Sequence, residues 1–310
     1  MPNKPIIIDC DPGVDDAIAL MLAFASPELT ILGITTVAGN VPLSLTQANA
    51  RKICELAQRS DIPVYAGCPR PMLQPLQTAE EIHGKTGLEG TELPPPTMPL
   101  QSEHAVSFLI RTLEHAATPI TLATLGPLTN IAIALIQAPH IAQNIQSIVM
   151  MGGAITLGNI TPAAEFNIYG DPHAADVVFR SGIPITLISL DVTHQVLTTP
   201  ERLVNIRAIA SPVGQTAANL LSFYGQLDCD RYEMQGAPLH DPNVIAYLLQ
   251  PQLYLGKPCH VTVETATSHS LGQTIVDVWG VLGKPPNATV IQTVDANGFY
   301  RLLVDRLSTL

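Results

Sequence analysis

Short apolar runs rich in Ile, Val and Thr alternate along this chain with segments whose apolar residues recur at helical spacing. The apolar runs are PIIID (5–9), TILGITTV (30–37), ITLAT (120–124), SIVMM (147–151) and PITLISLD (184–191). The helical segments are 15–26, 43–59, 102–116, 127–137 and 172–181. Continuous apolar strands alternating with helices indicate βαβ units, because helices then cover both faces of a parallel sheet.

This alternation predicts an α/β fold, with a mostly parallel, Rossmann-like open sheet and helices on both of its faces. With 310 residues and 46% hydrophobic content, the chain can bury such a sheet as one domain spanning residues 1–310. Two segments lack the pattern: the proline-rich residues 68–100, and residues 223–240, which run into GAPLHD. Loops this long in a compact domain are usually functional, and each carries a histidine, so we expect long active-site loops.

Composition excludes several classes of protein. Lys and Arg number 15 against 26 Asp and Glu, and the net charge of -11 argues against a nucleic-acid partner, which requires a basic face. The five cysteines are scattered without a C-x-x-C pair, which favours a reducing cytoplasm over a disulfide framework or a zinc site. No apolar run approaches the roughly 20 residues of a membrane span or forms a secretion signal. We therefore expect a cytoplasmic protein without a membrane partner.

Polar motifs follow the predicted strands at the point where each strand ends. They are DCDPG after the first strand, AGN (38–40), LGPLTN (125–130), MGG (151–153) and LDVTH (190–194). Open α/β sheets bind their ligands in a crevice outside the carboxyl ends of the strands. We expect these motifs to line one such crevice.

The first motif concentrates acidic residues to an unusual degree, because Asp9, Asp11, Asp15 and Asp16 lie within eight positions. Two unit charges about 4 Å apart near a protein surface repel by roughly 4 kcal/mol, and no basic residue lies between Lys4 and residue 51. One interpretation is helix capping, since acids satisfy free N–H groups at a helix start. A cap needs one or two acids, however, so the surplus favours a hard divalent cation such as calcium.

Two further interpretations concern the later acidic motifs. An aspartate-nucleophile phosphatase would use Asp9 and Asp11 together with GDPHAAD (170–176), yet no Lys or Arg lies between residues 112 and 179 to offset phosphate charge. Asp171 is more simply a helix cap before Pro172. Asp241, which precedes Pro242, could likewise be a cap.

Taken together, the motifs resemble those of one enzyme family. They are DCDPGVDDA (9–17), AGN (38–40), HGKTG (83–87), GPLTN (126–130), MGGA (151–154), GNITPAAEFNIYGDP (158–172) and APLHDP (237–242). In this order, from residue 5 to beyond residue 280, they are similar to the nucleoside hydrolases, which cleave the N-glycosidic bond of ribonucleosides. The pattern is most similar to that of the bacterial pyrimidine-preferring members.

The resemblance implies a calcium ion and assigns residues around it. Calcium would be held by Asp11, Asp16, Asp241 and the main-chain carbonyl of Leu125. Asp11 would also take a proton from the attacking water, and Asp15 would bind the sugar hydroxyls. The ion would neutralise the acidic cluster and lower the pKa of the water. The sequence departs from the family pattern at Leu125, where Thr is common, and at Lys85 and Thr86 in HGKTG.

The resemblance also places residues around the ribose and the base. Glu165 and Asn167 are two positions apart and would point the same way in an extended segment, although a polar turn explains them equally well. The implied ribose-binding residues are Asn40, Met151, Asn159, Glu165 and Asn167. His240 and His83 are candidate donors to the leaving base, and Tyr232 is a candidate to contact the base. Each of these three also has a structural interpretation, as a core histidine or a packing tyrosine.

These observations predict an N-glycosyl hydrolase. Breaking the glycosidic bond passes through an oxocarbenium-like transition state, which a cluster of carboxylates without basic neighbours stabilises. We expect calcium-dependent hydrolysis of ribonucleosides to ribose and base, a role in nucleoside salvage, and a homodimer or homotetramer. The alternative from another class is a calcium-assisted nucleoside-binding or sensor protein that does not turn its ligand over.

Overall fold

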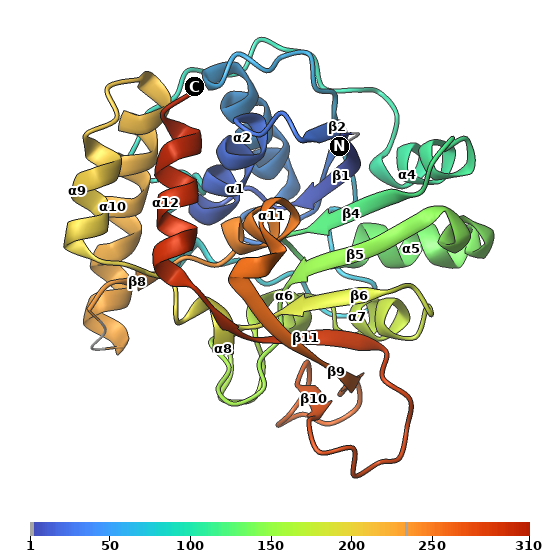
Figure 1. The fold of residues 1–310 in the computed structure, drawn as a ribbon. Helices are drawn as coiled ribbons and strands as arrows, with labels where there is room; N and C mark the ends of the chain where they lie inside the picture. The colour runs from blue at the N-terminus through green and yellow to red at the C-terminus, as the bar shows by residue number, and fades with distance from the viewer. Residues whose placement is uncertain (1–2, 233–234) are drawn as a thin grey trace.

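A computed structural model describes the backbone of residues 3–232 and 235–310, and the side chains of these ranges except residues 226–232. The described residues form a central nine-stranded sheet in the order β10-β9-β11-β6-β5-β4-β1-β2-β3 (Figure 1). The strands of this sheet are β1 (Lys4–Cys10), β2 (Leu29–Thr36), β3 (Val64–Ala66), β4 (Ile120–Thr124), β5 (Ile145–Met151), β6 (Ile185–Ile188), β9 (Tyr254–Val263), β10 (Thr274–Asp277) and β11 (Ala288–Val294). A small separate sheet pairs β7 (Leu197–Thr198) with β8 (Ala237–Pro238).

The sheet is parallel from β3 through β11 and becomes antiparallel at one edge, where β9 pairs with β11 and β10 pairs with β9. The predicted mostly parallel α/β fold is therefore confirmed. The antiparallel edge was not predicted, because β9 has the sequence YLGKPCHVTV, in which Gly256, Lys257 and Pro258 interrupt the apolar pattern. Proline is tolerated in strands mainly where it need not donate to the ladder.

Helices cover both faces of the sheet. They are α1 (Val14–Phe24), α2 (Leu43–Leu56), α3 (Glu80–His83), α4 (Ala105–Glu114), α5 (Thr129–Gln137), α6 (Phe166–Gly170), α7 (Pro172–Phe179), α8 (Leu190–Thr193), α9 (Pro200–Arg207), α10 (Pro212–Tyr232), α11 (Pro242–Leu249) and α12 (Ala296–Leu307), with short 3₁₀ helices at Pro139–Asn144 and Pro251–Leu253. In Figure 1, α4, α5 and α7 lie on one face, and α1, α2, α11 and α12 lie on the other.

The continuous run of isoleucines in β1 is explained by the burial of both faces of the strand. Ile6 and Ile8 belong to the apolar cluster that includes α1, α11 and α12, whereas Ile7 belongs to the cluster that includes α4, α5 and α7. Successive side chains in a strand point to opposite faces, so a strand between two helical layers must be apolar at every position. The central strand thus presents its carboxyl end, Asp9 and Cys10, to the edge where the polar motifs follow.

The predicted helices over 15–26, 43–59, 102–116, 127–137 and 172–181 correspond to α1, α2, α4, α5 and α7, with ends shifted by a few residues. The prediction of a loop over 223–240 is wrong in its first part, because α10 continues to Tyr232. Gly225 in this helix costs only about 1 kcal/mol relative to alanine, which does not end a helix of this length. Residues 68–100 are mostly irregular, as predicted, apart from α3.

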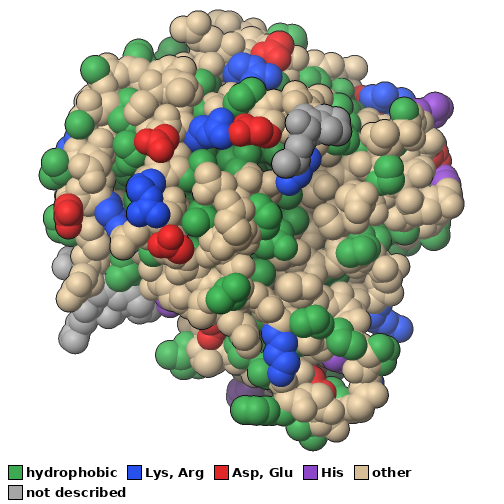
Figure 2. Space-filling model, viewed as in Figure 1, with side chains coloured by type: hydrophobic (Ala, Val, Ile, Leu, Met, Phe, Trp, Pro, Cys, Tyr) green, Lys and Arg blue, Asp and Glu red, His purple; other side chains and the backbone are tan. Residues whose placement is uncertain are grey.

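Within the described ranges, no helix combines the length and the apolar character needed to cross a membrane. Figure 2 shows charged side chains of both signs gathered over α9 and α12, where Glu201, Arg202, Arg301 and Asp305 line a shallow groove. The projecting lobe below, built from β9, β10 and the loop after β10, instead exposes apolar side chains such as Trp279 and Val281.

Candidate active site

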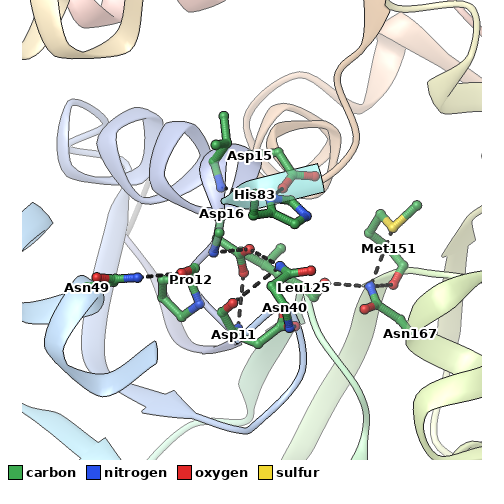
Figure 3. Close-up of polar contacts among 12 residues, drawn as sticks. Asp11, Pro12, Asp15, Asp16, Asn40, Asn49, His83, Leu125, Met151 and Asn167 are labelled. Carbon is green, nitrogen blue, oxygen red and sulfur yellow. Dashed lines mark hydrogen bonds and ion pairs between the residues drawn. The ribbon is translucent and has the colours of Figure 1, made fainter. Parts of the chain in front are cut away.

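The motifs that follow the strands meet in one pocket at the carboxyl edge of the sheet. Ten of the residues named from the sequence line it: Asp15, Asn40, His83, Leu125, Met151, Asn159, Glu165, Asn167, His240 and Asp241. Asp11 and Asp16 are fully buried beside this pocket, in the turn after β1 and in the first turn of α1, respectively (Figure 3). The backbone of Tyr232 closes α10, but its side chain lies outside the described residues.

The turn between β1 and α1 is organised by Asp16. One of its carboxylate oxygens accepts from the amide of Asp11 at 3.1 Å, and the other accepts from the amide of Gly13 at 3.0 Å and from Asn40 Nδ2 at 3.0 Å. The helix-capping interpretation is therefore confirmed for this one acid. Because capping uses only Asp16, it leaves the other acids of the motif unexplained.

Asp11 is held tightly on one side and left open on the other. Its Oδ2 accepts from the amide of Asn40 at 2.7 Å, while its Oδ1 has no hydrogen-bond partner among the described residues. Two glycines make room for this carboxylate, since a Cβ on Gly39 would lie 2.0 Å from Oδ2 and one on Gly126 would lie 2.2 Å from Oδ1. The AGN and LGP motifs thus carry glycine where the backbone must approach Asp11.

Asp15 and Asp241 extend the cluster toward the pocket. Asp15 Oδ1 has no hydrogen-bond partner within the described structure. Asp241 occupies the N-cap position of α11, yet its side chain caps no amide there, so the helix-capping interpretation of Asp241 is wrong. Carboxylate oxygens of Asp15, Asp16 and Asp241 lie within 4.8 Å of one another. Four acids from two distant segments therefore share one small volume.

Burial governs the protonation of these groups. Loss of hydration raises the pKa of Asp11 and Asp241 well above the usual range, and the charges of the neighbouring acids raise it further. Burial likewise raises the pKa of Asp15 to about 7 and that of Asp16 to about 6. Burial also raises the pKa of Asp9 to about 7, although Asp9 sits behind the cluster. Its Oδ2 accepts from Thr35 and Asn130, and its Oδ1 has no partner among the described residues. A divalent cation would offset this charge and return the acids to their ionised form.

The donor set suits a hard cation. Every titratable side chain of the cluster offers carboxylate oxygens, which calcium and magnesium prefer, and no described Cys or His belongs to the group of close ligand atoms. The carbonyl of Leu125 lies beside the cluster and accepts from Asn167 Nδ2 at 2.6 Å (Figure 3). A carbonyl oxygen has two lone pairs, so it can keep this bond and still face an ion.

Residues of the 158–167 segment form the opposite wall of the pocket. Glu165 is the N-cap of α6, and its oxygens accept from the amides of Gly153, Asn167 and Ile168 at 2.8, 2.9 and 3.2 Å. Of the two interpretations left open for Glu165 and Asn167, the turn is confirmed and the extended segment is wrong, because the chain enters α6 directly after Glu165. Asn159 Oδ1 accepts from the amide of Phe166 at 2.9 Å and closes this turn.

Asn167 joins the two sides of the pocket. Its Nδ2 donates to the carbonyl of Leu125 and lies 3.3 Å from the carbonyl and 3.6 Å from the sulfur of Met151. One amide thus ties the loop after β4 to the end of β5, where both line the pocket.

The two candidate histidines come from the long segments. His83 ends α3, is 5% exposed, and accepts at Nδ1 from the amide of Val14 at 3.1 Å. His240 follows β8, and its Nδ1 lies 2.7 Å from Thr193 Oγ1. Burial lowers the pKa of each ring to about 3, so both are neutral at physiological pH. A neutral imidazole has one N–H donor and one acceptor.

The remaining pocket residues were not named as site residues from the sequence. They are Thr78, Ala79, Glu81, Ile82, Ile160, Phe166, His194, Tyr224 and Pro238. His194 could have been found, because it ends the LDVTH motif that follows β6. Tyr224 carried no such signal, since its segment was expected to be a loop and is part of α10.

The second acidic motif proposed for a phosphatase has a structural role. Asp171 caps α7 by accepting from the amide of Ala174 at 3.1 Å, which confirms the capping interpretation, and its Oδ2 also accepts from Thr129 and from the amide of Met72. No Lys or Arg among the described residues lines the pocket. The pocket is therefore built for a neutral or cationic group rather than a phosphate.

Comparison with known proteins agrees with this architecture. The family model described as inosine-uridine preferring nucleoside hydrolase matches residues 6–301. The chain belongs to this family. The relatives in this family are N-glycosyl hydrolases, so the chain is placed in this class of enzyme rather than among the aspartate-nucleophile phosphatases.

Individual relatives of this nucleoside hydrolase cover the whole chain. It is 49% identical over 307 residues to the pyrimidine-specific ribonucleoside hydrolase RihA of Photobacterium profundum, covering 99% of each chain. Among solved structures, it is similar to the plant nucleoside hydrolase PpNRh1, with a TM-score of 0.93, 34% identity and full coverage of both chains. It is also similar to a purine-preferring ribonucleoside hydrolase from Gardnerella vaginalis, with a TM-score of 0.92, 34% identity and coverage of 99% and 98%.

Proposed function

We propose that this nucleoside hydrolase is calcium-dependent and cleaves ribonucleosides, with preference for pyrimidines, into ribose and free base. The observation that carries the proposal is the cluster of four buried carboxylates beside a wall of amide and carboxylate side chains. Two oxygens of the cluster, Asp11 Oδ1 and Asp15 Oδ1, have no partner among the described residues. A buried polar atom without a partner is costly, so these oxygens fit a cation and a polar ligand.

The residues that would hold calcium are Asp11, Asp16, Asp241 and the carbonyl of Leu125. Calcium suits this set because it accepts six to eight oxygen ligands in flexible geometry, whereas magnesium keeps more of its waters. When bound, the ion would lower the pKa of the attacking water and offset the charge of the cluster. Carboxylate oxygens of Asp15, Asp16 and Asp241 lie within 4.8 Å of one another, which supports a cation at this end of the pocket.

Asp11 is the residue best placed to accept the proton of the attacking water. Its Oδ2 is fixed by the amide of Asn40, which leaves Oδ1 with free lone pairs. The water oxygen would attack the anomeric carbon as the C–N bond breaks, and the electron pair of that bond would stay on the base. Positive charge then develops on the sugar, and the carboxylates of Asp11 and Asp15 stabilise it.

The ribose would be held by hydrogen-bonding groups on both sides of the pocket. Asp15 and Asn40 come from the acidic end, and Asn159, Glu165 and Asn167 come from the opposite wall, with Met151 beside them. Glu165 keeps lone pairs for a sugar hydroxyl, since each of its oxygens can accept more than one bond. Binding at several hydroxyls would orient the sugar for attack.

The base would lie toward His83 and His240. Because Val14 N–H is a donor, Nδ1 of His83 must be the acceptor, and this ring offers its Nε2–H to the pocket. His83 therefore serves as a hydrogen-bond donor. The preference for pyrimidines rests on the 49% identity to a pyrimidine-specific relative, compared with 34% to a purine-preferring one.

The test is release of reducing sugar from uridine, cytidine, inosine and adenosine by purified protein. The assay is run on protein treated with chelator and again after calcium or magnesium is restored. Ribose release that returns with calcium, and is faster for the pyrimidines, supports the proposal. Absence of release from all four nucleosides by folded, calcium-loaded protein contradicts it.

Four wider properties complete the proposal. A single domain over residues 1–310, a role in nucleoside salvage and a homodimer or homotetramer follow from the family. A reducing, cytoplasmic location is consistent with Cys10, Cys54, Cys68 and Cys259, which are free and buried. Light scattering tests the assembly, since a single 33.1 kDa species would reject it.

A further inference from the structure

His83 and His240 both line the pocket, but different groups hold their Nδ1 atoms. A backbone N–H of Val14 faces His83 and can only donate. The hydroxyl of Thr193 faces His240 at 2.7 Å and can either donate or accept. The tautomer of His83 is thus fixed by the backbone, whereas that of His240 depends on where the Thr193 proton points.

Two acceptors compete for that proton. One is Nδ1 of His240 at 2.7 Å, and the other is the carbonyl of Leu190 at 3.4 Å, one turn earlier in α8. Hydroxyl donors usually lie 2.5–3.0 Å from their acceptors, so the longer contact is weak. The hydroxyl therefore donates to Nδ1, and a ring that accepts at Nδ1 carries its proton on Nε2.

The surroundings direct Nε2 into the pocket. Thr193 is fully buried and does not line the pocket, whereas His240 does. Nε2 of His240 makes no hydrogen bond to any described residue. It is also absent from the set of fully buried polar atoms without a partner, so it is not sealed off from solvent. It is thus the ring nitrogen that remains accessible from the pocket.

We propose that Thr193 is a positioning residue that fixes His240 as an Nε2–H donor toward the departing base. The inference rests on the proposed function. As the glycosidic bond breaks, its electron pair stays on the base, and the negative charge spreads to the carbonyl oxygens and ring nitrogens of the base, which can accept this hydrogen bond. The hydrogen bond from Nε2–H becomes stronger as that charge develops, so it stabilises the transition state more than the ground state.

The backbone around His240 is held without help from Thr193. The amide of Leu239 donates to the carbonyl of Val196 at 2.9 Å, next to the pairing of β7 with β8. Asn243 Nδ2 also donates to the carbonyl of Leu239 at 2.6 Å. Removing the Thr193 hydroxyl should therefore release the ring of His240 while the loop stays in place.

The kinetic test compares T193V and T193S on two substrates. Uridine needs a donor to its leaving group, whereas p-nitrophenyl β-D-ribofuranoside releases a stable phenolate and does not. We expect T193V to lose about tenfold in kcat on uridine, with KM within threefold, and to keep the wild-type rate on the nitrophenyl substrate. T193S should restore most of the loss. The matched control is T198V, which removes a buried hydroxyl bonded to Tyr300 outside the pocket and should spare both substrates.

Unchanged kcat on uridine in T193V, or an equal loss on both substrates, overturns the inference. Nitrogen-15 NMR of histidine-labelled, calcium-loaded wild-type protein gives an independent answer, with the His240 signals assigned by their loss in H240N. Protonated Nε2 and bare Nδ1 support the inference, and the opposite tautomer overturns it. If the wild-type protein releases no ribose from any nucleoside, the proposed function fails, while the NMR result still decides the tautomer.

Discussion

The two ends of the pocket are built in different ways. The acidic end consists of Asp11, Asp15, Asp16 and Asp241, and three of these four come from six consecutive residues that follow β1 and run into the first turn of α1. The base end consists of His83, His194, Tyr224 and His240, which come from α3, the residue after α8, α10 and the residues after β8. One end is thus local in the sequence, and the other is assembled from four distant segments.

The difference also appears in how the side chains are held. At the acidic end, the amides of Asp11, Gly13 and Asn40 donate to carboxylates, and the backbone at Gly39 and Gly126 approaches Asp11 too closely for a side chain there. At the base end, the ring of His240 depends on the hydroxyl of Thr193. We infer that the acidic end is rigid and serves the reaction common to the family, whereas the base end can vary with the base.

The largest expected effect is at the acidic end. In Asp11→Asn, the side chain keeps its bond to the amide of Asn40 but can no longer accept a proton. We expect kcat on uridine to fall by about 10³, within the range of a lost general base, with little change in the melting temperature. The exposed Asp305→Asn is the control for a lost charge. Retention of more than a tenth of wild-type kcat would remove Asp11 from its proposed role.

Steric displacement should also be costly at this end. Gly126→Ala places a Cβ 2.2 Å from Asp11 Oδ1 and forces the carboxylate to move. A misplacement of about 1 Å can cost about 10²-fold in rate, so we expect a loss of this order together with weaker calcium binding. Gly225→Ala in α10 is the matched control, because its Cβ meets no described atom within 4 Å, and it should be neutral or slightly stabilising. Full activity of Gly126→Ala would show that the acidic end can adapt.

A substitution at the base end should separate chemistry from metal binding. We expect His240→Asn to lose roughly 10- to 100-fold in kcat on uridine, because the leaving base loses a donor. Calcium affinity, measured by calorimetry, should stay within about twofold, since His240 is not a ligand in the proposed set. A large loss of calcium affinity in this variant would mean that the two ends are not independent.

The smallest expected effect is on the stability of the metal-free protein. Burial raises the pKa of Asp15 to about 7 and that of Asp16 to about 6, from 3.8, so the folded chain binds more protons than the unfolded chain in this interval. Stability should therefore be greatest below pH 4 for these groups and decline as pH rises to about 7. We expect the melting temperature of chelated protein to fall by a few degrees between pH 5 and pH 7.5, with calcium reversing the loss at pH 7.5. A rise in the melting temperature between pH 5 and pH 7.5 would contradict the raised pKa values of Asp15 and Asp16 as the cause.

The contrast between the two ends explains which features of the protein were predictable from the sequence. Strands and helices were predictable because burial on both faces imposes continuous apolar runs on β1, β4 and β5. The acidic cluster was predictable because four acids near one turn exceed what capping requires. The conformation at Glu165 stayed undecided between an extended segment and a turn, since its capping of α6 depends on where the chain turns after β5. Residues 223–232 were misjudged because a glycine and polar residues obscure the helical pattern of α10, whose earlier residues Leu220, Leu221 and Tyr224 are buried.

By itself, therefore, the sequence determined the mostly parallel sheet, the edge at which polar motifs collect, and the family to which the chain belongs. These features follow from local rules, namely side-chain periodicity and the order of motifs along the chain. Only the tertiary structure decided which atoms of the acids are left without partners, which nitrogen of each histidine carries the proton, and which residues complete the base end. Those properties depend on contacts between segments that are far apart in the sequence, such as the one between Asn130 and Asp9, which are 121 positions apart. No local pattern encodes such contacts.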